Sequence, residues 1–286
     1  MAATLRTVRA NGLEVACREF GKGPLVVLLH GFPDTAETWD DLAEKLATAG
    51  YRAVAPHLRG YHPTTIPADG DYSVAKLAAD LVALIDELGE RRAAVIGHDW
   101  GAAVGYAAAN LAPDRISKLV ALAIPHARTI KPTPGLLWRA PHFLLFQFGA
   151  LSRWYVARND LAYIDHLYAY WAPNWKVPRE QLERVKAAFR LPGRLSAALG
   201  YYTALRTDGL DRVKQRLYRQ KTSVPTLAIG GRADGALDPA AYAATPEAFT
   251  GPYEVELIDR AGHFPHREEP EVCARLILKF LGAPPA

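Results

Sequence analysis

Short apolar runs alternate with longer helical patterns along most of this chain, and no other feature constrains its fold as strongly. Residues 25–29 read LVVLL, as expected of a strand that is buried on both faces of a sheet. Similar runs occur at residues 51–55, 93–96, 119–124, 226–229 and 254–258. Between two of them, Ser73 and Gly89 are expected to start and stop a helix that carries leucines along one face. This alternation indicates a mostly parallel sheet flanked by helices.

Residues 128–217 interrupt the alternation. No buried-strand pattern occurs there, and 11 of the chain's 28 aromatic residues lie between Trp138 and Trp175. Asn159 and Asp160 are expected to cap a helix within this region. A helical, aromatic-rich insertion is typical of a lid over a site at the ends of the strands, although these side chains could also simply form the core of a helical subdomain. We therefore expect a first core segment (1–127), a helical cap (128–217) and a second core segment (218–286).

The composition excludes several classes of function. The 34 Lys and Arg residues exceed the 30 Asp and Glu residues by only four, which is too small an excess to indicate binding to nucleic acid or anionic lipid. Two cysteines cannot form a disulfide framework, which favours a reducing, cytoplasmic location. No signal-like segment and no apolar run near ~18 residues occurs, so we expect no membrane partner.

Gly97-His98-Asp99-Trp100-Gly101 joins an expected strand to an expected helix. This pattern has the shape of the nucleophile elbow, a sharp strand-to-helix turn usually written G-x-S-x-G. Asp99 stands in the place of the serine, and a carboxylate is ionised at neutral pH without help from a base. It suits attack on a tetrahedral carbon that bears a leaving oxygen or halide. From this motif alone, a nucleophile and a cap of the following helix both remain open for Asp99.

Three further segments favour the catalytic interpretation. His30-Gly31-Phe32-Pro33 follows a buried strand, where backbone amides could form half of an oxyanion hole and the Trp100 amide the other half. His263 follows the last expected strand, where a general base is expected. Asp234 follows the preceding strand and offers an acid to orient that base. The order nucleophile, acid, histidine along the chain is the order found in this kind of architecture.

The chain resembles the α/β-hydrolase superfamily over nearly its whole length, and within it the epoxide hydrolase branch. The resemblance rests on HGFP, GHDWG, the Asp234 loop and AGHF, which occur in that family's order and spacing. It implies an α/β-hydrolase fold: a mostly parallel eight-stranded sheet flanked by helices, with an inserted helical cap. It also implies that Asp99 is the nucleophile, Asp234 the acid and His263 the base. The Phe32 and Trp100 amides would form the oxyanion hole, with a cis peptide bond before Pro33.

The same resemblance implies that two lid side chains hold the epoxide oxygen. Tyr202 matches the second lid tyrosine of the family, whereas His142 stands where the first is expected. Some relatives carry such a His-Tyr pair. A second departure is Arg59-Gly60-Tyr61-His62-Pro63, because relatives more often continue Gly-x-Ser after the first glycine. Further pocket positions are expected at His30, Pro33, Phe143, Phe146, Tyr201 and Phe264.

Epoxide hydrolysis is therefore the leading hypothesis, with a small hydrophobic epoxide and water as substrates. No cofactor is expected, and no metal, since the H-x-x-H spacing of His263 and His266 lacks a third ligand. Haloalkane dehalogenation uses the same Asp-His-Asp set, but such relatives usually have Asn or Glu where Phe32 stands. Haloacetate hydrolysis needs arginines just after the nucleophile, and the chain has none there. A non-catalytic ligand-binding scaffold remains an alternative, and both a monomer and a homodimer remain open.

Overall fold

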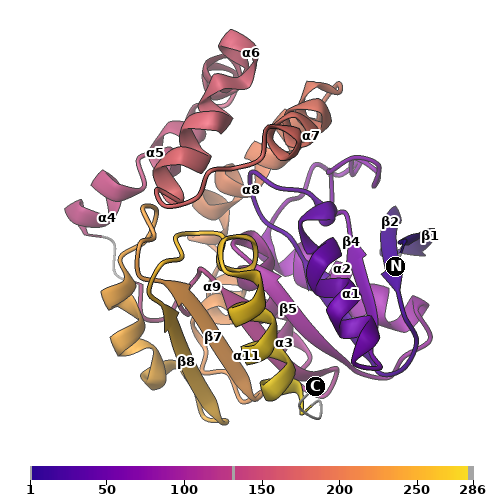
Figure 1. Cartoon of the computed structure of the whole chain (residues 1–286). Helices are drawn as coiled ribbons and strands as arrows, with labels where there is room; N and C mark the ends of the chain where they lie inside the picture. The colour runs from indigo at the N-terminus through magenta and orange to yellow at the C-terminus, as the bar shows by residue number, and fades with distance from the viewer. Residues whose placement is uncertain (1, 131–132, 283–286) are drawn as a thin grey trace.

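The computed structural model describes residues 2–130 and 133–282 (Figure 1). In these residues one sheet contains eight strands in the order β1-β2-β4-β3-β5-β6-β7-β8. β2 is antiparallel to both of its neighbours, and β4, β3, β5, β6, β7 and β8 run parallel. This confirms the expected mostly parallel eight-stranded sheet. The strands are β1 (Thr4–Ala10), β2 (Leu13–Phe20), β3 (Leu25–Leu29), β4 (Arg52–Pro56), β5 (Ala93–His98), β6 (Ile116–Leu122), β7 (Thr226–Gly231) and β8 (Tyr253–Ile258).

Helices cover both faces of the sheet and enclose a buried apolar cluster on each. α2 and α3 contribute to the cluster on one face, while α1 and α11 contribute to the cluster on the other face (Figure 1). The helical segments of this core are η1 (Ala36–Trp39), α1 (Asp40–Thr48), α2 (Val74–Glu87), α3 (Trp100–Leu111), α9 (Arg212–Arg219), η3 (Pro239–Ala248), α10 (Pro265–Glu268) and α11 (Pro270–Leu281).

Local backbone chemistry sets several of these boundaries. The Ser73 hydroxyl accepts a hydrogen bond from the Lys76 amide and caps α2, as expected. Gly89 follows that helix with a φ of +83°, which glycine adopts without strain. β6 ends at Leu122, two residues before the expected end at 124, because Ala123 has a φ of 66° and leaves the extended conformation.

A group of helical segments is inserted between β6 and β7 and lies over the carboxyl ends of the strands (Figure 1). We call this group the inserted helices. Asn159 and Asp160 do not simply cap a helix there. Together with Leu161 they adopt left-handed φ values of 51°, 55° and 60° and break α6 into two parts. The group comprises α4 (Pro134–Arg139), α5 (His142–Leu145), η2 (Phe146–Phe148), α6 (Ala150–Trp171), α7 (Arg179–Arg190) and α8 (Arg194–Asp208). Within the described residues, no helix is both long and apolar enough to cross a membrane.

Candidate active site

Asp99 lies at a sharp turn between β5 and α3, with φ 51° and ψ −118°. Glycines make this turn possible because other backbone groups approach them closely. A Cβ atom added to Gly97 would lie 2.2 Å from the Gly101 carbonyl oxygen, and one added to Gly101 would lie 2.0 Å from the Leu29 carbonyl oxygen. The strained backbone at Asp99 is typical of a functional turn, and it presents the side chain at the carboxyl end of the sheet.

The Asp99 carboxylate is 8% exposed and faces two groups from other loops. Its Oδ1 accepts a hydrogen bond of 2.9 Å from the Phe32 amide, and its Oδ2 lies 3.5 Å from Nε2 of His263. The side chain accepts no hydrogen bond from the first turn of α3, all of which the structure describes. This arrangement favours the nucleophile interpretation over the helix-cap interpretation.

His263 and Asp234 meet as expected from their positions after β8 and β7. Nδ1 of His263 lies 2.9 Å from Oδ2 of Asp234, so the carboxylate accepts a hydrogen bond from Nδ1 and orients the ring. Oδ1 of Asp234 accepts hydrogen bonds from the Ala236 and Leu237 amides at 2.7 and 3.1 Å. With Nδ1 engaged in this way, His263 turns Nε2 toward Asp99.

The charges of these three groups support one another. Burial disfavours the charged form of His263, but the charges and hydrogen bonds of Asp234 and Asp99 outweigh it and raise the pKa of His263 to about 10. Burial likewise disfavours the charged form of Asp99. The hydrogen bond and charge of His263 and the bond from the Phe32 amide prevail, and they lower the pKa of Asp99 below its ordinary value. Asp99 is therefore a carboxylate at neutral pH.

The loop that carries His263 is held on both sides by Glu268 of α10. Its two carboxylate oxygens accept hydrogen bonds from the Gly262 amide at 2.7 Å and from the Phe264 amide at 2.8 Å. The His263 amide donates to the Trp171 carbonyl oxygen of α6 at 3.0 Å, and the Gly235 amide donates to the same oxygen at 3.2 Å. The Trp171 carbonyl of the inserted helices thus binds both the loop that carries His263 and the loop that carries Asp234. Sequence reasoning missed Glu268 and Trp171.

The two expected lid residues lie together, with Tyr202 beside Trp100. The rings of His142 and Tyr202 are 5.7 Å apart, and the Tyr202 ring lies 5.1 Å from that of Trp100. Burial lowers the pKa of His142 to about 3, despite the opposing charge of Asp99, so its imidazole is neutral at pH 7. Burial and the Asp99 charge raise the pKa of Tyr202 well above 10, whereas a hydrogen bond with the Trp100 side chain opposes this shift. Tyr202 therefore keeps its phenolic proton.

Comparisons with known proteins agree with this geometry. Residues 24–270 match the family described as the α/β hydrolase fold. The chain belongs to the α/β-hydrolase fold family. It is 32% identical over 281 residues to the AB hydrolase superfamily protein YfhM of Bacillus subtilis (strain 168), with 96% of each chain covered. It is 31% identical over 318 residues to epoxide hydrolase A of Mycobacterium tuberculosis (strain ATCC 25618 / H37Rv), with 98% of each chain covered.

Solved structures give the same result. The crystal structure of an epoxide hydrolase from Vigna radiata superposes with a TM-score of 0.85 at 26% identity, covering 98% of both chains. Epoxide hydrolase A from Mycobacterium thermoresistibile superposes with a TM-score of 0.83 at 29% identity, also covering 98% of both chains. The likeness therefore includes the inserted helices as well as the sheet.

In this α/β-hydrolase, aromatic rings surround the lid pair. Phe146 is fully buried, and its ring lies 4.8 Å from that of Tyr202 and 5.5 Å from that of Phe32. The half-buried Phe143 has its ring 4.7 Å from His142 and 5.7 Å from Tyr202. These contacts place both phenylalanines beside the lid pair, where the sequence suggested pocket positions.

The other expected pocket residues connect the site to its surroundings. Pro33 follows a cis peptide bond, as the resemblance implied, and its carbonyl oxygen accepts a hydrogen bond from the Tyr168 hydroxyl at 3.1 Å. His30 uses both ring nitrogens within loops, since Nδ1 donates to the Gly31 carbonyl and Nε2 accepts from the Leu58 amide. Phe264 is fully buried, with its ring stacked 4.7 Å from that of Tyr168.

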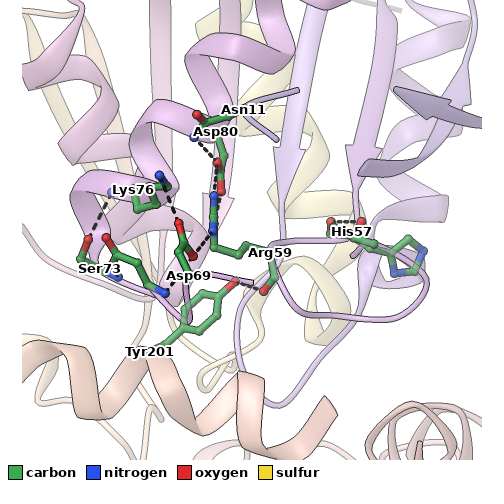
Figure 2. Close-up of polar contacts among 10 residues, drawn as sticks. Asn11, His57, Arg59, Asp69, Ser73, Lys76, Asp80 and Tyr201 are labelled. Atoms are coloured by element: carbon green, nitrogen blue, oxygen red, sulfur yellow. Dashed lines mark hydrogen bonds and ion pairs between the residues drawn. The ribbon is translucent and has the colours of Figure 1, made fainter. Parts of the chain in front are cut away.

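Tyr201, by contrast, turns its hydroxyl away from its neighbour in the sequence, Tyr202. The hydroxyl donates to the Arg59 carbonyl oxygen at 2.8 Å (Figure 2). The Tyr201 ring lies 5.5 Å from that of Trp100, so the side chain borders the site through its ring.

Two buried histidines lie beneath His263. Nε2 of His98 donates to the His263 carbonyl oxygen at 2.8 Å, and Nε2 of His266 lies 2.9 Å from the Thr38 hydroxyl. Within residues 2–130 and 133–282, no group of three His, Cys, Asp or Glu residues is placed to hold a metal ion. Because each of these rings is engaged by a neighbouring loop, we assign both a packing role.

Proposed function

We propose that the chain is an epoxide hydrolase that opens an epoxide to a vicinal diol through an ester on Asp99, and that the inserted helices form its cap. One observation carries the proposal: a carboxylate, not a hydroxyl, occupies the elbow, with the Phe32 amide at 2.9 Å and His263 Nε2 at 3.5 Å. The epoxide hydrolases of M. tuberculosis and V. radiata, which this chain resembles over nearly its whole length, support the same activity.

In the first step, a carboxylate oxygen of Asp99 attacks one ring carbon, and the carbon–oxygen bond of the strained ring breaks. The bonding electron pair moves to the epoxide oxygen, which gains negative charge. Tyr202, which retains its proton at neutral pH, donates it to this oxygen, while the neutral His142 contributes a second hydrogen bond. Such donors act chiefly in the transition state, because the charge that they stabilise develops there.

In the second step, water attacks the carbonyl carbon of the ester and transfers a proton to His263. The Phe32 and Trp100 amides stabilise the tetrahedral oxyanion. The intermediate collapses, the acyl–oxygen bond breaks, and His263 gives its proton to the departing diol oxygen. Asp99 regains its charge, and the second proton of the water replaces the one lost by Tyr202. The sum is epoxide plus water to diol.

The pKa of His263 is expected to differ between these two steps. In the free enzyme the charges of Asp234 and Asp99 raise that pKa to about 10, which favours an imidazolium and not a base. Alkylation neutralises Asp99 and removes one of these charges, so the pKa of His263 falls. The imidazolium then loses its Nε2 proton to solvent and becomes a base once an ester is present for water to attack, and it regains that proton when Asp99 recovers its charge.

A haloalkane dehalogenase would need N–H donors for the departing halide. Relatives of that kind usually have Asn or Glu where this chain has Phe32, whose side chain offers no polar group to the halide. This difference favours the epoxide over the halide as leaving group.

The test is a substrate panel of epoxides and haloalkanes in which diol and halide release are followed in parallel. Diol without halide is the expected result. Release of halide would contradict the proposal in favour of dehalogenation. No turnover of either class would favour a ligand-binding scaffold.

A further inference from the structure

The loop after β4 carries a tyrosine, Tyr61, that the mechanism above does not use. The structure holds this loop rigidly through the side chain of Arg59, which is only 1% exposed. The Arg59 guanidinium makes two hydrogen bonds to the carboxylate of Asp80, at 2.6 and 2.8 Å, and lies 3.3 Å from Asp69 (Figure 2). The Tyr201 hydroxyl on the Arg59 carbonyl ties the same loop to α8.

Tyr61 itself is 2% exposed, and its hydroxyl has no hydrogen-bond partner among the described residues. Its backbone is fixed, because the Tyr61 amide donates to the Leu58 carbonyl at 2.9 Å. Its ring lies 4.6 Å from that of His30, 5.8 Å from that of Tyr201 and 5.9 Å from that of Phe189. A buried hydroxyl without a partner lowers the stability of the folded state, so a residue held this firmly needs an explanation.

The residues around the Tyr61 hydroxyl indicate where a hydrogen-bond partner for it could bind. Two rings that contact Tyr61 also contact the site: the Tyr201 ring lies 5.5 Å from that of Trp100, and the Phe189 ring lies 5.7 Å from that of Phe32. Burial raises the pKa of Tyr61 well above 10, so its hydroxyl keeps its proton. His30 offers it nothing, since both ring nitrogens of His30 are already engaged in loop hydrogen bonds. With no acceptor among the described residues, the hydroxyl is free to donate to a group that binds in the adjoining site.

We propose that Tyr61 is a specificity-determining residue that donates a hydrogen bond to an oxygen of the substrate outside the epoxide ring. This inference rests on the proposed function and deepens it. The preferred substrates are epoxides with an ether, hydroxyl or carbonyl oxygen near the ring, and not plain hydrocarbon epoxides. Such an oxygen satisfies the buried donor, whereas a methylene group leaves it unpaired.

The test compares phenyl glycidyl ether with its carbon analogue, 4-phenyl-1,2-epoxybutane, in which a methylene replaces the ether oxygen. Tyr61→Phe is expected to lower kcat/KM for the ether about tenfold, the worth of one hydrogen bond, and to leave the carbon analogue within about twofold. Tyr106→Phe is the matched control. It removes a buried phenol of α3 that donates to the Ile124 carbonyl, and it should leave the ratio of the two substrates unchanged.

An equal change for both substrates in Tyr61→Phe, or no change for either, would overturn the inference while the proposed function stands. If the wild type turned over neither epoxide, both would fall. A wild-type measurement covers the case in which the variant does not fold. The ether-containing product, 3-phenoxy-1,2-propanediol, should inhibit about tenfold more strongly than 4-phenyl-1,2-butanediol. Equal inhibition by the two diols would also overturn the inference.

Discussion

The core loops and the inserted helices hold their parts of the site in different ways. In the core loops, hydrogen bonds fix each charged group: Asp99 by the Phe32 amide, Asp234 by two amides, and His263 by Asp234. In the inserted helices, His142 and Tyr202 are packed among aromatic rings, and Nδ1 of His142 has no hydrogen-bond partner among the described residues.

The difference corresponds to two kinds of group: those that carry a full charge in the free enzyme, and those proposed to stabilise charge only during ring opening. Groups that carry full charge need partners before the substrate arrives, because an unpaired buried charge is costly. Groups that are proposed to act on charge developing in the transition state must remain available to the substrate, and packing among aromatic rings positions them. The inserted helices also reach into the core, through the Trp171 carbonyl on the His263 and Gly235 amides.

The largest effect is expected from the core, in His263→Gln. Ring opening should survive, because only the second step needs a base, and ester hydrolysis should slow by at least about a thousandfold. Intact mass spectrometry should then find protein plus one substrate. Unmodified protein after incubation with a substrate that the wild type turns over would refute this role.

The inserted helices should give a smaller effect on the other step. Tyr202→Phe and His142→Phe should each slow alkylation of Asp99 about a hundredfold, the usual loss for one transition-state donor, with little change in substrate binding. His142→Tyr should retain substantial activity, because a phenol supplies the same hydrogen bond. Rapid-quench measurements of ester formation test this. Rates within about twofold of wild type for both Phe variants would remove the pair from the mechanism.

Glu268 allows the two steps to be separated within the core, since its hydrogen bonds hold the residues on both sides of His263. In Glu268→Gln one acceptor oxygen becomes a donor facing an amide, so ester hydrolysis should slow about tenfold while alkylation stays unchanged. Glu269→Gln, which changes the next residue along the chain, is the matched control and should leave both steps alone. An equal loss in both steps would indicate a general structural role for Glu268.

His263 and His142 should have opposite effects on how the free energy of unfolding depends on pH. The pKa of His263 is raised from 6.5 to about 10, so its stabilising contribution is complete below pH 6.5 and is lost as the pH rises toward 10. The pKa of His142 is lowered from 6.5 to about 3, so the folded state loses stability as the pH falls below 6.5. Unfolding free energies from denaturant titrations should therefore depend less on alkaline pH in His263→Gln and less on acidic pH in His142→Phe.

The sequence was informative wherever residue type and strand position together determine a location. Asp99, Asp234 and His263 each follow a parallel strand, and the carboxyl ends of such strands meet at one edge of a sheet, so their meeting could be predicted. The early end of β6 could not, because it depends on the positive φ of Ala123. The limits of the cap, set at 128 and 217, remain a prediction.

The supporting residues escaped prediction for a related reason. The Trp171 contribution is a backbone carbonyl, which every residue possesses, and only the path of α6 determines where it lies. The Tyr201 hydroxyl likewise found a carbonyl, that of Arg59, which its position beside Tyr202 did not indicate. Glu268 carries a signal of position alone, five residues after His263, and its role appears only when its two hydrogen bonds are seen.

We propose that Asp99 is the nucleophile and forms an ester with the substrate. A single turnover in water labelled with heavy oxygen tests it most directly, with enzyme in excess over the epoxide. Because water attacks the ester carbonyl, the heavy oxygen should appear in the Asp99 carboxylate, and peptide mass spectrometry would locate it there. Heavy oxygen found only in the diol after that first turnover would mean direct attack by water on the epoxide and would contradict the ester.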